Sequence, residues 1–218
     1  YKKKVIDLMA VQKLQLDQKK YNLQYIEKLS TVVYFDDALR FLFKEYAKRD
    51  DFKRTIFVIT GDHRMPEIPI ATQIDRFHVP LLIWSPMVKQ PARFSSIVTH
   101  FDVVPSFLSF MKNRYGVKIP TVSAWIGHGL DTCRGFRGRY NYPLMRNKNE
   151  FMDFVDGTTF IAGNTFFTIY PNLDIEAVDD ILGIQKIKQK LNNFKNQNEL
   201  ACSKNKLIPD SLIKRYGN

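Results

Sequence analysis

The stretch that most constrains the fold of this chain is TIFVITGDHR, residues 55–64. Residues 55–60 are a short run of β-branched and aromatic side chains, which predicts a fully buried strand of the kind found in parallel sheets. Gly61 ends this run, and Asp62 and His63 follow at once. Because successive residues of a strand point to opposite faces, both side chains can reach one ligand only if the backbone turns into a loop at Gly61.

The pair Asp62 and His63 offers two donor types that metal ions bind in proteins. One carboxylate oxygen and one imidazole nitrogen are half of a coordination shell for a zinc- or manganese-type ion. Open α/β sheets bind ligands beyond the carboxyl ends of their strands, and the pair falls at such an end. A structural interpretation stands beside this one, in which Asp62 caps the next element and His63 is simply hydrogen-bonded.

Length and composition restrict the class of protein. The 218 residues, with 44% hydrophobic and 25% charged side chains, suit one globular domain with or without a small appendage. The net charge is +11, but the basic residues are scattered, and the sequence has no zinc-finger, RNA-binding or glycine-rich phosphate motif. Solvated basic faces explain the charge better than nucleic acid, which is an unlikely partner.

Features that report on location are sparse in the sequence. The two cysteines, Cys133 and Cys202, lack metal-binding spacing and do not fix a redox compartment. No apolar run approaches the roughly 18 residues of a transmembrane helix, and no signal peptide is present. Because the chain begins with Tyr1 rather than Met, we expect a fragment whose targeting segment, if there is one, lies upstream.

Hydrophobic spacing and turn residues predict alternating helices and strands, hence an α/β fold. Ser30 or Thr31 is the expected cap of the second helix, Asp102 the expected N-cap of the third, and Gly116 its end. The expected elements are an amphipathic helix in 2–28, a helix over 30–49, strands at 55–60, 77–84 and 94–99, a helix after 102, a hairpin turning at 163–164, and a helix over 175–197.

The order of several motifs resembles a known family. A strand, the GDH loop of residues 61–63, VPLLIWSP at 79–86 and THFDVVPSFLSF at 99–110 follow one another as in the C-terminal half of the sulfatase-like catalytic domain of the alkaline phosphatase superfamily. The lipoteichoic acid synthase type is the most similar, over roughly residues 30–135. The resemblance implies the C-terminal part of an alkaline-phosphatase-like sandwich with a mixed or mostly parallel sheet, followed by a small α+β appendage.

Three segments follow from this expectation. Residues 1–29 are an amphipathic helical lead-in, residues 30–150 the C-terminal half of the sulfatase-like domain, and residues 151–218 a small hairpin-and-helix subdomain. In the family, the Asp and His of the GDH motif ligate a divalent ion, which assigns Asp62 and His63 as metal ligands. Manganese or zinc is favoured over magnesium or calcium, because His63 argues against a site of oxygen ligands alone.

The other ligands of the family, a carboxylate and the threonine nucleophile, come from an N-terminal half that residues 1–29 do not resemble. No catalytic residue is therefore assigned in this chain, and Thr60 in particular is not given the nucleophilic role. The missing N-terminal half is an expected partner. Among the remaining polar residues, Arg64 can bind an anionic ester, because guanidinium matches phosphate and sulfate geometry, or can pair with Glu67 or Asp75 instead.

Several further positions have alternative interpretations. His100 is a candidate near the substrate, since it lies at a strand-to-helix switch, whereas Asp102 is favoured as a cap. His78 is favoured as a hydrogen-bonding residue at a strand end. In WIGHGLD, residues 125–131, the glycines suit tight turns, and His128 departs from the family's pattern.

Two functions remain open at this point. The resemblance implies a bacterial, membrane-anchored enzyme with its domain outside the cytoplasm that transfers or hydrolyses phosphate, phosphoglycerol or sulfate esters, and of which this fragment alone is inactive. The alternative is a non-catalytic, basic α/β domain that binds an anionic polymer such as teichoic acid, a sulfated glycan or nucleic acid. Steep salt dependence would favour the second function.

Overall fold

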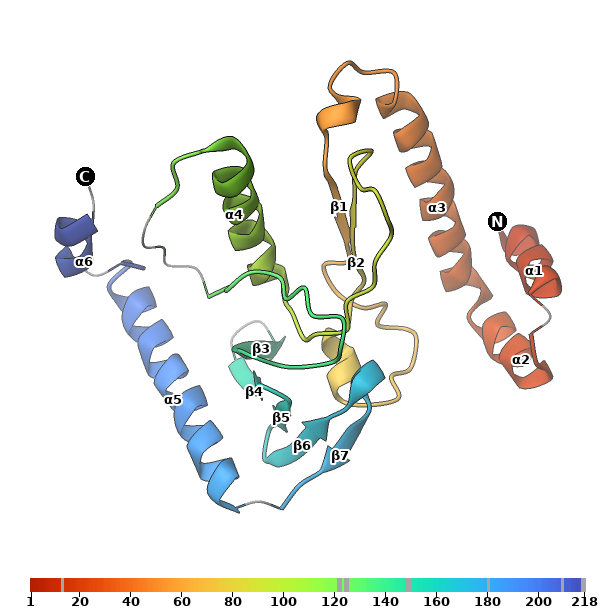
Figure 1. Cartoon of the computed structure of the whole chain (residues 1–218). Coiled ribbons are helices and arrows are strands. Elements are labelled where there is room, and N and C mark those ends of the chain that lie inside the picture. Colours follow the sequence, from red (N-terminus) through yellow and green to blue (C-terminus); the bar gives the residue numbers. More distant parts are fainter. Residues whose placement is uncertain are drawn as a thin grey trace. The chain divides into compact units, whose positions relative to one another are not determined.

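The computed structural model describes residues 1–12, 14–120, 123, 126–147, 150–179, 181–208 and 210–216. The contacts divide the chain into two compact units (Figure 1). Unit 1 comprises residues 1–71 and 78–91, and unit 2 comprises residues 72–77 and 92–218. The division into three segments at residues 29 and 150 stays a prediction. We describe each unit by itself.

Three helices begin unit 1: α1 (Lys2–Val11), α2 (Leu16–Gln24) and α3 (Ile26–Tyr46). Val5 and Met9 of α1 are buried, and α1 packs on α3. The cap predicted at Ser30 or Thr31 is wrong, because α3 begins four residues earlier. Ser30 lies inside the helix, and its hydroxyl donates a 2.6 Å hydrogen bond to the carbonyl of Ile26.

The strands of unit 1 are β1 (Phe57–Thr60) and β2 (Leu81–Trp84), which pair antiparallel with Phe57 opposite Trp84. Phe43 of α3 packs edge-on against both of these rings, with centroids 4.8 and 5.0 Å away, so aromatic contacts fix the helix on the ribbon. β2 is shorter than the strand predicted over 77–84. A short 3₁₀ turn precedes β1 at Phe52–Arg54.

The prediction of a fully buried, parallel β1 is wrong. Along β1 half-buried and exposed residues alternate, and Val58 is 38% exposed. The chain returns from β1 to β2 without a crossover α-helix, and a direct return of this kind gives an antiparallel pair. The α/β class is confirmed, but both sheets in the described part of the chain are antiparallel, and a mostly parallel sheet is not among them.

Unit 2 is built on a five-stranded antiparallel meander in the order β3-β4-β5-β6-β7. The hairpin turn predicted at Gly163 and Asn164 is confirmed between β5 and β6, and Gly163 has the positive φ of 62° that such a turn favours in glycine. The strands are β3 (Asn141–Asn147), β4 (Glu150–Asp156), β5 (Thr159–Ala162), β6 (Thr165–Ile169) and β7 (Ile175–Ala177).

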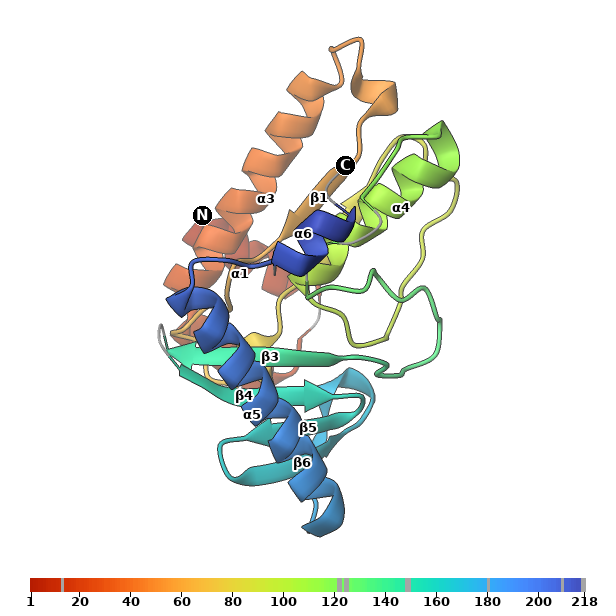
Figure 2. The ribbon, with the colours of Figure 1, turned by 90° about the vertical axis from the view of Figure 1, so that its left-hand side faces the viewer.

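Both faces of this sheet are covered by apolar side chains. On one face Phe154, Ile161 and Phe166 pack against Ile187 and Leu191 of α5 (Ile181–Ser203), which lies along the sheet in Figure 2. On the other face the buried cluster consists of Ile74, Val155, Phe160, Ala162 and Ile169. The helix predicted over 175–197 therefore has the wrong start, because residues 175–177 pair with β6 as an edge strand.

The helix predicted after Asp102 is confirmed as α4 (Val103–Tyr115), and Gly116 ends it in the left-handed conformation. A 3₁₀ turn, His100–Asp102, precedes α4 directly. No strand forms over 94–99, all of which is described; there the Ile97 amide donates to the carbonyl of Arg137 at 2.9 Å. The remaining elements are the 3₁₀ turns Ile74–Phe77 and Pro171–Leu173, and α6 (Asp210–Tyr216).

Candidate metal centre

Asp62 and His63 lie in the loop that follows β1 directly, as the turn at Gly61 requires. Both side chains face solvent, with 91% of Asp62 and 66% of His63 exposed. The His63 amide donates a 3.0 Å hydrogen bond to Asp62 Oδ1, which orients the carboxylate. Its second oxygen, Oδ2, lies 3.7 Å from His63 Nε2. The loop therefore presents one carboxylate oxygen and one imidazole nitrogen side by side.

This spacing fits two ligands of one ion. A tetrahedral zinc-type ion with ligands about 2.1 Å away holds any two of them about 3.4 Å apart. The tautomer of His63 also fits, because Nδ1 lies 2.6 Å from the carbonyl oxygen of Arg64, and a carbonyl can only accept. Nδ1 therefore carries the proton in this contact. In the neutral ring, Nε2 then keeps its lone pair free for a ligand, the state in which imidazole binds a metal.

A complete metal shell is not assembled by the described residues. Among them, no group of three or more histidine, cysteine, aspartate or glutamate side chains is arranged to hold an ion. Asp62 and His63 thus fit as two ligands, and their assignment to a metal stays a prediction.

Arg64 makes contacts that neither sequence interpretation anticipated. Its Nη1 lies 2.7 to 3.2 Å from the carbonyl oxygens of Met65, Pro66 and Ile68. The suggested acidic partners are engaged elsewhere: Glu67 accepts from Lys28 at 2.6 Å, and the Asp75 carboxylate accepts from the Thr72 amide at 2.9 Å. The role of Arg64 in binding an ester stays a prediction.

His100, the other predicted substrate residue, belongs to unit 2, whereas Asp62, His63 and Arg64 belong to unit 1. It is exposed and lies in the 3₁₀ turn before α4. Whether it shares a site with the GDH loop stays a prediction.

The most enclosed polar group of unit 2 is Asp102, whose side chain is fully buried. Its Oδ2 accepts from the Thr99 amide at 2.8 Å and from the Tyr142 hydroxyl at 2.9 Å. Its Oδ1 accepts from the amides of His128 and Gly129 at 2.8 and 3.3 Å. Asp102 occupies the predicted N-cap position of α4, but its side chain makes no capping hydrogen bond to that helix. It instead bonds back to Thr99, the cap of the 3₁₀ turn, and ties the segment 126–130 and β3 to the start of α4. These long-range partners have no local signature in the sequence.

One tyrosine and one aspartate of unit 2, Tyr142 and Asp131, have shifted pKa values. Burial raises the pKa of Tyr142 far above its usual value, and its hydrogen bond to Asp102 adds to the effect. The Arg137 guanidinium donates two 2.7 Å hydrogen bonds to Asp131 and lowers the pKa of that carboxyl to about 2, although desolvation opposes the shift. We assign both groups a structural role, because their partners, Asp102 and Arg137, also belong to unit 2.

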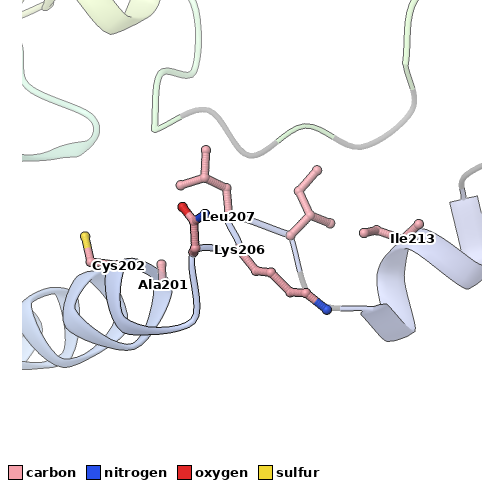
Figure 3. A pocket seen from close by; sticks show the side chains of 7 residues that line it. Ala201, Cys202, Lys206, Leu207 and Ile213 are labelled. Atoms are coloured by element: carbon pink, nitrogen blue, oxygen red, sulfur yellow. The ribbon is translucent and has the colours of Figure 1, made fainter.

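A cavity of about 520 Å³ lies at the C-terminal end of unit 2 (Figure 3). Its only charged lining residue among the described ones is Lys206, and Asp210 holds that ammonium at 2.8 and 2.9 Å. None of the predicted site residues lines it. The lining residues are Ala201, Cys202, Asn205, Lys206, Leu207, Ile208 and Ile213.

Comparisons with known proteins add one match. Neither the comparison with curated proteins nor the comparison with solved structures found a similar protein. In the part of the chain that the structure describes, no helix combines the length and the apolar character needed to cross a bilayer. Residues 8–113, a little under half of the chain, match the family model described as Sulfatase, and this match supports a sulfatase-like domain of the alkaline phosphatase superfamily.

Proposed function

We propose that the protein is part of a metal-dependent enzyme that transfers or hydrolyses phosphate or sulfate esters, of the lipoteichoic acid synthase type. The observation that carries this proposal is the GDH loop inside the matched region, where Asp62 Oδ2 and His63 Nε2 lie 3.7 Å apart directly after β1. The proposed substrate is an anionic ester, phosphoglycerol, phosphate or sulfate. The proposed location, by resemblance, is the bacterial cell envelope, with a membrane anchor and the domain outside the cytoplasm.

The residues of this chain supply one side of the proposed site. Asp62 holds a divalent ion through Oδ2 as an anionic ligand, and His63 holds it through Nε2 as a neutral one. We propose manganese or zinc, since both accept this mixed oxygen and nitrogen set. Such an ion, when bound, polarises an ester oxygen and favours the alkoxide of a nearby hydroxyl. The remaining carboxylate ligand and the threonine nucleophile, by resemblance, come from an N-terminal half outside residues 1–218.

The proposal is tested on the protein extended upstream, with p-nitrophenyl sulfate and bis(p-nitrophenyl) phosphate as probes. We expect hydrolysis that requires added Mn²⁺ or Zn²⁺, and a fall in kcat/KM of at least about 100-fold in Asp62→Asn, because one metal ligand is weakened. Asp50→Asn is the matched control, an exposed aspartate of the same unit. Wild-type turnover in Asp62→Asn would refute the metal-ester site.

A second candidate, binding of an anionic polymer, is favoured by the net charge of +11 and by the segment 134–140. There the Arg134 guanidinium lies 4.8 Å from the ring centre of Phe94, and the Arg139 guanidinium lies 5.5 Å from that of Tyr140. His128 stacks on the same tyrosine at 4.1 Å. Affinity for teichoic acid or a sulfated glycan that falls steeply with salt, and that ignores chelators and Asp62→Ala, would favour this function.

A further inference from the structure

We propose that Arg64 is a positioning residue of the metal site: its side chain folds the loop 64–68 and thereby fixes the backbone carbonyl that orients His63. This inference rests on the proposed function for its consequence, metal binding, but its structural part can be tested without a metal. It also replaces the expectation that the Nη1 donors of Arg64 bind the substrate.

The guanidinium is the centre of a small loop. The two N–H groups of Nη1 are shared among the carbonyl oxygens of Met65, Pro66 and Ile68, at 2.9, 3.2 and 2.7 Å. The Ile68 amide closes the same loop by donating to the Met65 carbonyl at 3.2 Å. Arg64 is half-buried, whereas Asp62 and His63 are exposed. A cation that satisfies three carbonyls in this way holds a loop that contains no regular secondary structure.

The loop is also tied to the helix layer of unit 1. Glu67, at the tip of the turn, accepts a 2.6 Å hydrogen bond from Lys28 of α3. The side chains of Lys28 and Glu67 are 41% and 48% exposed, so solvent screens the ion pair and it contributes little on its own. The guanidinium, which donates to three carbonyls of the loop, is therefore the main support of the conformation.

The same residue supplies the contact that orients the histidine. The carbonyl oxygen of Arg64 lies 2.6 Å from His63 Nδ1, so the ring carries its proton there and keeps Nε2 for a ligand. Histidine side chains without such a contact favour the opposite tautomer, with the proton on Nε2. Since the Arg64 side chain fixes the backbone that begins with its own carbonyl, loss of the guanidinium should release the ring as well as the loop.

Nitrogen NMR of the four histidines reads the tautomer directly in the metal-free chain, at a pH where imidazole is neutral. We expect His63 in the Nδ1–H form in the wild type and a shift toward the Nε2–H form in Arg64→Gln. Arg64→Lys should keep most of the wild-type signal, because an ammonium can also donate to several carbonyls. If Arg64 instead bound the substrate through two parallel hydrogen bonds, lysine could not replace it. Arg54→Gln, an exposed arginine of unit 1, is the control.

Manganese affinity, measured by calorimetry on the same substitutions in the protein extended upstream, gives the second readout. We expect a loss of about 10- to 100-fold in Arg64→Gln, typical for groups that orient a metal ligand, and near wild-type affinity in Arg64→Lys and Arg54→Gln. An unchanged His63 tautomer in Arg64→Gln would overturn the inference. If the tautomer shifts but the wild-type protein extended upstream binds no manganese, the positioning role stands and the proposed function fails.

Discussion

Replacing Asp102 by alanine is expected to lower the free energy of unfolding of unit 2 by roughly 3–5 kcal/mol, because each buried donor left without an acceptor costs about 1–3 kcal/mol. The fully buried carboxylate accepts from the amides of Thr99 and His128, both at 2.8 Å, and from the Tyr142 hydroxyl at 2.9 Å. Alanine removes the acceptor for these three donors and for the longer contacts from the Gly129 amide and the Thr99 hydroxyl, both at 3.3 Å. The loss should appear as faster hydrogen exchange of the sheet amides.

Tyr142→Phe is the control for this prediction. It removes one donor and leaves the carboxylate with its backbone partners, so we expect a smaller loss of about 1.5–3 kcal/mol, typical of one hydrogen bond to a charged group. A loss in Asp102→Ala no greater than that in Tyr142→Phe would contradict the view that Asp102 joins the turn, the segment 126–130 and β3.

Gly127→Ala is expected to destabilise unit 2 by at least about 3 kcal/mol, at or above the upper end of ordinary overpacking. A Cβ at this position would lie 1.9 Å from the carbonyl oxygen of Phe101 and 2.8 Å from the amide nitrogen of Asp102. Both are backbone atoms of the turn that begins α4, so neither can move aside as a flexible side chain can. The segment around residue 127 would have to leave that turn.

Gly135→Ala is the matched control, because a Cβ there meets nothing within 4 Å. Thermal unfolding followed by circular dichroism, with hydrogen exchange of the sheet amides, measures both variants. Equal stability of the two variants would show that the contact between Gly127 and Phe101 is absent in solution.

Local chemistry in the sequence predicted one hairpin turn and the C-terminal end of α4 correctly. The turn at Gly163 and Asn164 and the end of α4 at Gly116 both follow from glycine's access to positive φ, which depends on the residue itself. The loop placement of Asp62 and His63 likewise follows from Gly61 and the strand before it. These features needed no knowledge of the rest of the chain.

Pairing between distant segments could not be predicted in the same way. The apolar run at 55–60 is compatible with a buried parallel strand and with a strand of an antiparallel ribbon. The pairing with β2 makes it antiparallel. Residues 175–177 became a strand because β6 offered an open edge. Tyr142 meets Asp102 across 40 positions of sequence, and no local pattern marks that pair.

Arg64 shows a third limit, which concerns competition for one side chain. Sequence spacing suggested an ester or the nearby acids Glu67 and Asp75 as its partners. In the structure three carbonyls of its own loop take its Nη1 donors. Every residue has a backbone carbonyl, so the types of the residues near Arg64 in the sequence do not predict such contacts.

The central claim, that Asp62 and His63 bind one divalent ion, is tested most directly by calorimetric titration with Mn²⁺ and Zn²⁺. The titration compares this chain with one extended upstream, each with Asp62→Ala beside it. We predict tight binding that needs the upstream half and vanishes in Asp62→Ala, because two of the ligands come from the GDH loop and the others from outside residues 1–218. Equal, weak binding in all four proteins would contradict the metal site and leave the anionic-polymer function as the better account.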